Sequence, residues 1–174
     1  MSLKYLEINL QNTIAIQSLS MLANDILKEH YDPIIGVIQN DYMLNKFQSV
    51  QALTEQLEQN YRYYFVCNMD DEKVGFIGFY PREEDLYLSK FYLNKNYRGK
   101  GIAMDMFEFV KSQAKQLGFS SITLNVNKNN AIAIRAYEKL GLIRVAQEKI
   151  NIGNGYYMDD YVYQYLIKKN PEDI

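Results

Sequence analysis

The sequence predicts a mixed α/β fold in which helices pack in layers against a β-sheet. Segments with apolar residues on one helical face alternate along the chain with short runs of β-branched and aromatic residues. Hydrophobic residues make up 48% and charged residues 23% of the 174 residues, which is enough apolar material for one packed core. The chain has no internal repeat and no linker rich in proline, glycine and serine, so we expect residues 1–174 to form a single domain.

The first part of the chain predicts one strand followed by two helices. A short strand is expected over residues 3–8, and apolar residues then recur on one helical face over residues 13–29. Asp32-Pro33 is expected to break this helix, because proline cannot donate the backbone hydrogen bond that would continue it. A second helical region covers about residues 39–59.

The rest of the chain predicts a sheet whose strands are interrupted by two further helices. Gly118 and Gly141 are expected to end these helices, because glycine readily adopts the left-handed conformation of a helix C-cap. The last two strands flank a turn rich in asparagine and glycine and therefore predict a hairpin. In order, the elements are strands over residues 63–67, 74–80 and 86–93, a helix after Gly101, a strand over residues 122–126, a helix over residues 130–140, and strands over residues 142–150 and 156–167.

The strand over residues 86–93 changes its apolar phase. Leu86 and Leu88 share one parity, whereas Phe91 and Leu93 share the other. An extra residue near Ser89-Lys90 would bring both halves onto one face, so the pattern predicts a β-bulge there.

Composition excludes several functional classes. The formal net charge of -2 provides no general attraction for nucleic acid or for an anionic membrane. A single cysteine, Cys67, and a single histidine, His30, exclude an internal disulfide and favour no metal site. No stretch approaches the roughly 20 apolar residues that cross a bilayer, and the first residues lack the pattern of a secretion signal, so we expect a cytoplasmic protein.

Two segments carry chemistry. The first precedes a predicted helix, where unpaired N–H groups, flexible glycines and basic side chains together suit an anion such as pyrophosphate. An ordinary glycine turn is the alternative interpretation of that segment. The second segment is also explained by a helix with an asparagine N-cap, a buried tyrosine and a glycine C-cap. The segments are Arg98-Gly99-Lys100-Gly101-Ile102-Ala103 and the stretch from Asn130 to Leu142.

Taken together and in this order, the two segments resemble the GNAT superfamily of acyl-CoA N-acyltransferases. The resemblance covers most of residues 86–142 and implies a mixed, mostly antiparallel sheet with a central splayed parallel strand pair and helices on both faces. Leu142 stands where the family more often has phenylalanine. The matched positions are Arg98, Gly101 and Ala103 in the pyrophosphate motif, and Asn130, Ala133, Tyr137 and Gly141 in the later motif.

The resemblance implies acetyl-CoA as the cosubstrate, without a metal, and gives each matched residue a role. Backbone groups of Phe91, Tyr92 and Leu93 would pair with the pantetheine arm like an added strand. Backbone N–H groups of residues 98–103 would hold the pyrophosphate. A backbone N–H in the bulged strand would stabilise the oxyanion that forms when an amine attacks the thioester.

Three residues of the later segment complete the implied site. Asn130 would hydrogen-bond the pantetheine arm, Lys139 would approach a CoA phosphate, and Tyr137 would lie near the sulfur. A tyrosine of pKa about 10 can protonate a leaving thiolate whose thiol has a pKa near 8.5 when the two are in contact. We therefore expect Tyr137 to be the acid of the reaction.

The base and the acceptor are less strongly indicated. Glu84, in the run Glu83-Glu84-Asp85, is the candidate base, and a solvated acidic turn is the alternative interpretation. His30 is expected to interact with a helix C-terminus, and Cys67 is expected to lie in the core. A looser resemblance to bacterial polyamine acetyltransferases suggests a small cationic amine as acceptor, with the acidic residues gathering around it. Those residues are Glu83, Glu84, Asp85, Asp159 and Asp160.

Two other interpretations stay open. The chain could be a non-catalytic acyl-CoA-binding module, although such a module has no need of a tyrosine beside the sulfur. Several of the 16 tyrosines fall in the C-terminal hairpin, which is consistent with an interface between two copies in a homodimer. Nucleic-acid binding is the least favoured function, because the sequence has no basic stripe.

Overall fold

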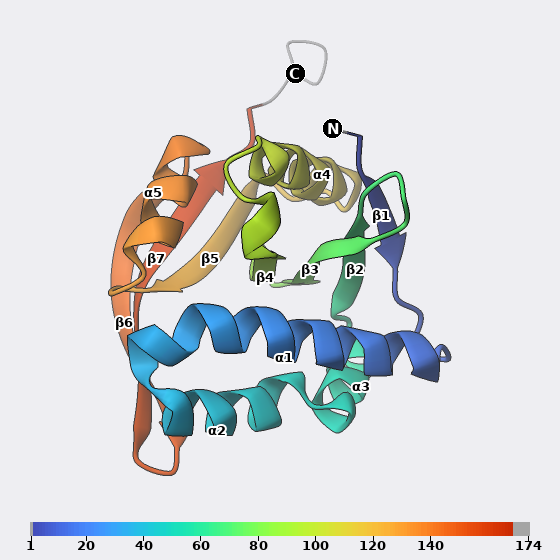
Figure 1. The fold of residues 1–174 in the computed structure, drawn as a ribbon. Helices are drawn as coiled ribbons and strands as arrows, with labels where there is room; N and C mark the ends of the chain where they lie inside the picture. Colours follow the sequence, from blue (N-terminus) through green and yellow to red (C-terminus); the bar gives the residue numbers. More distant parts are fainter. Residues whose placement is uncertain (1, 169–174) are drawn as a thin grey trace. The chain divides into compact units, whose positions relative to one another are not determined.

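The computed structural model describes residues 2–168 and has the mixed α/β architecture that the sequence predicts (Figure 1). Within these residues, no helix combines the length and the apolar character needed to cross a membrane. The elements, in chain order, are β1 (Lys4–Glu7), α1 (Thr13–Ile35), α2 (Val37–Gln48), α3 (Val50–Glu58), β2 (Arg62–Cys67), β3 (Lys73–Pro81), β4 (Leu86–Leu93), the 3-10 helix η1 (Lys95–Tyr97), α4 (Ile102–Gln116), β5 (Ser121–Asn127), α5 (Ala131–Lys139), β6 (Ile143–Gly153) and β7 (Tyr156–Leu166).

The strands form a mostly antiparallel sheet in the order β1-β2-β3-β4-β5-β7-β6. The pairs β1–β2, β2–β3, β5–β7 and β6–β7 are antiparallel. The pair β4–β5 is parallel, with Leu86 opposite Ile122 and Tyr87 opposite Thr123. The predicted mostly antiparallel sheet with a central parallel pair is therefore confirmed.

The chain divides into two compact units. The first unit comprises the residues up to Tyr80 together with Ser89–Ala103, and the second comprises Pro81–Leu88 and the residues from Met104 onward. Strand β4 is divided between them, because its first three residues belong to the second unit and the others to the first.

The first unit is built around the packing of three helices on β2 and β3. In Figure 1, α1 and α2 run side by side, and their contacts are among the most extensive between helices. Residues 63–67 of β2 are all buried, and Tyr63, Phe65 and Cys67, which share one face of the strand, belong to the core with the helices. The core contains Ile16, Leu19, Ala23, Ile26 and Leu27 of α1, Leu44 of α2, Leu53 of α3, Tyr63, Phe65 and Cys67 of β2, and Phe76 of β3.

The prediction that α1 ends before Pro33 is wrong. The helix continues through Pro33 to Ile35 and ends where the Gly36 N–H donates to the Asp32 carbonyl at 3.0 Å. Pro33 lies in the last turn, where its missing N–H removes only one hydrogen bond near the helix end. The Asp32 carboxylate also accepts a hydrogen bond from Asn40 Nδ2 of α2 at 2.8 Å, which holds this end of the helix in place.

The predicted second helix is two helices, α2 and α3. Ser49 separates them, because its extended backbone (ψ 158°) interrupts the helical path. The Ser49 hydroxyl accepts a hydrogen bond from the Ala52 N–H at 3.1 Å and caps the start of α3. A serine N-cap inside a helical pattern is the local signal for this break.

Burial along β4 shows the phase change that the sequence predicts. Leu86 and Leu88 are buried on one parity, and Leu93 is buried on the other. The intervening residues are half-buried. The β-bulge near Ser89 itself stays a prediction.

In the second unit, the two faces of the sheet differ in polarity. Leu124 pairs with Tyr163, whose hydroxyl donates to Glu138 of α5 at 2.8 Å, so this apolar face is the one that α5 covers. Thr123 and Asn125 alternate with the apolar residues of β5 and therefore lie on the opposite face. That face carries the polar groups described below.

Candidate active site

The turn that leads into α4 has a backbone conformation that glycine permits. Gly99 and Gly101 have φ angles of 76° and 78°, in the left-handed region. A Cβ atom at either position would meet no heavy atom within 4 Å, so the space beside the turn is open. The helix begins directly afterwards at Ile102, whose side chain is buried, and the first N–H groups of a helix have no partner within it.

The charges at this turn are mostly positive. Arg98 is held by a hydrogen bond from its Nε to the Leu93 carbonyl at 3.1 Å. Lys100 is exposed, with its Nζ 5.6 Å from the centre of the Tyr97 ring. Asp105, in the first turn of α4, is the one opposing charge in that turn. An open left-handed turn with two cations ahead of a helix is chemically suited to a diphosphate group, so these residues fit the pyrophosphate of CoA.

The second half of β4, residues 91–93, lies close against β3. A Cβ atom at Gly75 of β3 would lie 2.3 Å from the Tyr92 carbonyl oxygen, a distance that a real side chain cannot adopt. The Tyr92 hydroxyl lies 3.3 Å from the Tyr31 hydroxyl of α1, and the two share a hydrogen bond. The segment predicted to pair with pantetheine, Phe91, Tyr92 and Leu93, is thus fixed from both its backbone and its side chains.

The later segment forms α5, as predicted. Asn130 is the N-cap, 2% exposed, with its Oδ1 accepting a hydrogen bond from the Ala133 N–H at 3.2 Å. Gly141 follows the helix with a φ of 98°, which confirms the glycine stop. Tyr137 is buried within α5, and Lys139 is its last residue and is exposed. The Asn130 Oδ1 is thus engaged in capping α5.

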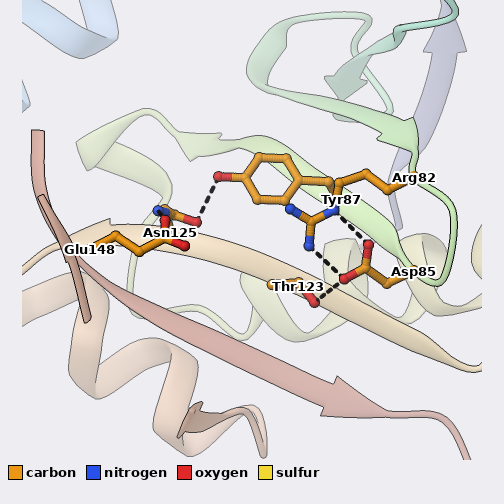
Figure 2. Close-up of polar contacts among 6 residues, drawn as sticks. All are labelled: Arg82, Asp85, Tyr87, Thr123, Asn125 and Glu148. Carbon is orange, nitrogen blue, oxygen red and sulfur yellow. Dashed lines mark hydrogen bonds and ion pairs between the residues drawn. The ribbon is translucent and has the colours of Figure 1, made fainter. Parts of the chain in front are cut away.

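The acidic turn before β4 separates into exposed and buried residues. Glu83 and the candidate base Glu84 are exposed. Asp85 is buried and accepts hydrogen bonds from Arg82 Nε and Nη2, both at 2.6 Å, and from the Thr123 hydroxyl at 2.6 Å (Figure 2). These hydrogen bonds, above all those from Arg82, hold the pKa of Asp85 below its usual value against the effect of burial. Asp85 is therefore an ionised structural carboxylate.

A second polar network lies two residues further along the chain, at Tyr87 of β4 and Asn125 of β5. The Tyr87 hydroxyl donates to Asn125 Oδ1 at 2.9 Å, and Asn125 Nδ2 donates to Glu148 at 3.0 Å (Figure 2). The same Nδ2 lies 3.5 Å from Asp160 Oδ2. Sequence reasoning missed this network. Its signal was an asparagine within an alternating strand, where amide side chains are uncommon.

The acidic residues predicted to gather around an amine have different partners. Asp85 pairs with Arg82, and Asp159 pairs with Lys128 at 2.5 Å, so both carboxylates are already neutralised. Asp160 is instead buried beside a second carboxylate, as described above. The charge available to a cationic acceptor is therefore smaller than the sequence alone suggests.

The roles expected for Cys67 and His30 have different outcomes. Cys67 is buried in the core of the first unit, as predicted, and burial raises the pKa of its thiol. His30 does not lie at a helix end, because α1 continues to Ile35. Its ring instead meets the edge of Tyr31, with a centroid distance of 4.8 Å.

The chain's fold corresponds to a known class of acyl-group-transferring proteins. The model of the acetyltransferase (GNAT) family matches residues 25–142, which is more than half of the chain. The chain therefore belongs to the GNAT acetyltransferase family. It is also 26% identical over 86 residues to the uncharacterized N-acetyltransferase YdgE of Bacillus subtilis, a match that covers 47% of this chain and 55% of that relative.

Solved structures share the fold. One is the PaiA N-acetyltransferase from Thermoplasma acidophilum in complex with coenzyme A, with a TM-score of 0.75 and 18% identity, covering 95% of this chain and 99% of that one. Another is the spermidine N-acetyltransferase from Vibrio cholerae, with a TM-score of 0.64 and 15% identity, covering 94% of this chain and 93% of that one. At these identities, the similarity shows the fold.

Proposed function

We propose that this chain transfers an acetyl group from acetyl-CoA to a primary amine, which attacks the thioester directly in a ternary complex. The observation that carries the proposal is the family match, which includes the open glycine turn at the start of α4. The match runs through residues of both compact units, so we further propose that residues 1–174 act as one acyltransferase domain. A non-catalytic acyl-CoA-binding module is the alternative.

The proposed binding roles follow the chemistry of the groups. The N–H groups and basic side chains of residues 98–103 hold the CoA pyrophosphate, and the backbone of residues 91–93 pairs with the pantetheine amides. Asn130 donates its amide to the pantetheine arm, and the exposed Lys139 approaches a CoA phosphate.

The proposed chemistry requires two proton transfers and one oxyanion site. A backbone N–H of β4 stabilises the oxyanion that forms at the thioester carbonyl. The Tyr137 hydroxyl gives its proton to the leaving CoA thiolate as the carbon–sulfur bond breaks. Glu84 is the base predicted from the sequence, and its exposure allows it to take a proton from an arriving amine.

Binding of CoA is tested by a matched pair of glycine variants. Gly101→Ala forces a non-glycine residue into a φ of 78°, which costs about 1 kcal/mol and moves the proposed pyrophosphate turn. Gly118→Ala imposes a similar strain at a φ of 85°, at the other end of α4 and also in open space. We expect CoA affinity, measured by calorimetry, to fall at least tenfold in the first variant only. Equal affinities in the two variants contradict the assigned turn.

Catalysis is separated from binding by Tyr137→Phe. We expect thiol release from acetyl-CoA in the presence of an amine to slow by at least tenfold, because the thiolate loses its proton donor. CoA affinity should change little, since the ring is kept. A wild-type protein that binds CoA but releases no thiol with any amine supports the binding module instead.

For the acceptor, we propose a small amine, and a polyamine within that class. The shared fold with a spermidine N-acetyltransferase supports this choice. Thiol release is compared for spermidine, a lysine peptide, free amino acids and an aminoglycoside. Spermidine is expected to give the highest kcat/KM, and no response to spermidine rejects the polyamine. Sizing the protein in solution tests the homodimer expected from its tyrosine-rich hairpin.

A further inference from the structure

Polar side chains cross the second unit's sheet on one face. Tyr87 of β4 pairs with Thr123 of β5, Asn127 of β5 pairs with Asp160 of β7, and Asp160 pairs with Glu148 of β6. Directly paired residues point to the same side of a sheet. The network of Tyr87, Asn125, Glu148 and Asp160, which we term the Asn125 network, therefore draws one residue from each of four strands.

The hydrogen bonds fix the orientation of the Asn125 amide. Two carboxylates accept hydrogen bonds from its nitrogen, so the amide oxygen must face the remaining partner. That partner is the Tyr87 hydroxyl, which donates at 2.9 Å (Figure 2). Asn125 thus presents its NH₂ group to Glu148 and Asp160 and holds both carboxylates near each other.

Within residues 2–168, no cationic side chain forms an ion pair with Asp160. It is 3% exposed, and its partner in the Asn125 network is a neutral amide shared with a second carboxylate. The charged groups that act on it are Glu148 from β6 and Asp159 beside it in β7, and Asp159 is itself paired with Lys128. Burial, followed by these like charges, raises the pKa of Asp160 to about 6.

A buried carboxylate with a raised pKa is suited to act as a general base. A base works best when its pKa lies near the working pH, which an ordinary aspartate does not satisfy. Glu148, at the outer end of the Asn125 network, is exposed, so the network reaches solvent. Tyr87 and Asn125 fall within residues 25–142, which the family model matches, whereas Glu148 and Asp160 lie beyond them.

We infer that Asp160 accepts the proton that the acceptor ammonium must lose before it attacks, with Asn125 and Tyr87 as positioning residues. The inference rests on the proposed acetyl transfer to an amine and replaces Glu84 as the base. The ammonium gives one proton to the Asp160 carboxylate, directly or through one water, and becomes a neutral amine.

The remaining steps balance the reaction. The amine lone pair forms the carbon–nitrogen bond, the carbon–sulfur bond breaks, and the thiolate receives the Tyr137 proton. The second amine proton passes to the Tyr137 phenolate and restores the hydroxyl, and Asp160 releases its own proton to solvent. The products are the acetylated amine, CoA thiol and one released proton.

The test is the pH dependence of kcat/KM between pH 5 and 8 in wild-type protein and three variants. In wild-type protein, we expect the rate to rise with a midpoint near the pKa of Asp160, about 6. Asp160→Asn should lose this rise and fall about 100-fold at pH 7.5. Glu148→Gln removes a like charge and should move the midpoint to lower pH. Glu84→Gln tests the other candidate base, and the rise with pH should persist in that variant with the same midpoint.

Each outcome decides the role of Asp160. A rise in rate that persists in Asp160→Asn, or one that disappears in Glu84→Gln, overturns the inference while leaving acetyl transfer intact. If Asp160→Asn loses CoA binding or fails to fold, the Glu148→Gln variant decides the question. A midpoint of the kcat/KM profile that does not move in Glu148→Gln overturns the inference. A wild-type protein that acetylates no amine at any pH is instead a failure of the proposed function.

Discussion

Asp85 and Asp160 are both buried carboxylates of the second unit, yet their surroundings act on them in opposite directions. Asp85 receives two hydrogen bonds from Arg82 and one from Thr123, and its pKa is lowered. Asp160 has a neutral amide shared with Glu148, and its pKa is raised to about 6. Asp85 and Tyr87 lie two residues apart in the sequence, as do Thr123 and Asn125 of β5.

The difference shows that pairing of the buried charge separates a structural carboxylate from a reactive one. A buried charge that is fully paired contributes to stability and has no reason to exchange a proton near neutral pH. A buried charge that is poorly paired costs stability, and that cost is tolerated where proton exchange is useful. Identical substitutions at the two positions should therefore have opposite effects on stability.

The largest effect is expected for Asp85→Asn. The variant loses charge-assisted hydrogen bonds to Arg82, so we expect the free energy of unfolding at pH 7 to fall by about 2 kcal/mol. Because the folded pKa of Asp85 lies below 3.8, its contribution is present above that pH and is lost as the pH falls through the folded value. Urea unfolding at several pH values measures the contribution of Asp85 to the free energy of unfolding. A loss that is unchanged at pH 3 disagrees with this account.

A smaller effect of opposite sign is expected for Asp160→Asn. The folded pKa is about 6, above the ordinary 3.8, so the folded protein holds this proton more tightly than the unfolded chain. Ionised Asp160 therefore costs stability above about pH 6, and the cost disappears as the pH falls toward 3.8. We expect the variant to be more stable at pH 8 by about 1 kcal/mol, with solvent screening allowed for, and equally stable at pH 4. If Asp160→Asn is less stable than wild-type protein at pH 8, Asp85 and Asp160 do not have opposite effects on stability.

The smallest effect is expected for Thr123→Val, which keeps the side-chain shape and removes one of three hydrogen bonds to Asp85. The free energy of unfolding should fall by about 1 kcal/mol, because the Arg82 contacts stay. In the Asp85→Asn background the same change should cost less, since the charged acceptor is gone. Equal costs in the two backgrounds would mean that Thr123 and Asp85 act independently.

Local signals predicted most of the elements. The alternation of residues 86–93 predicted β4 with its observed bounds, and Gly118 and Gly141 have the left-handed conformations expected of helix stops. Pro33 shows the limit of such signals. The α1 end depends on the contact between Asp32 and Asn40 of the next helix, which no local pattern contains.

The Asn125 network could not be predicted for a related reason. Its members come from four strands and meet only because parallel and antiparallel pairing bring them to one face. The sequence shows that Asp160 is acidic, but not that its neighbours include Glu148 instead of a cation. Likewise, Asp85 and Glu84 look equivalent in the sequence, and only their burial distinguishes them.

The close approach of β3 and β4 at Gly75 constrains how this protein can be diversified. Any larger residue would push the Tyr92 carbonyl aside, although Gly75 has no reactive group of its own. If position 75 is replaced by every other amino acid and the variants are selected for activity, only glycine should be retained. The other variants should bind the cofactor more weakly. A ranking of residues by the reactivity of their side chains would overlook Gly75.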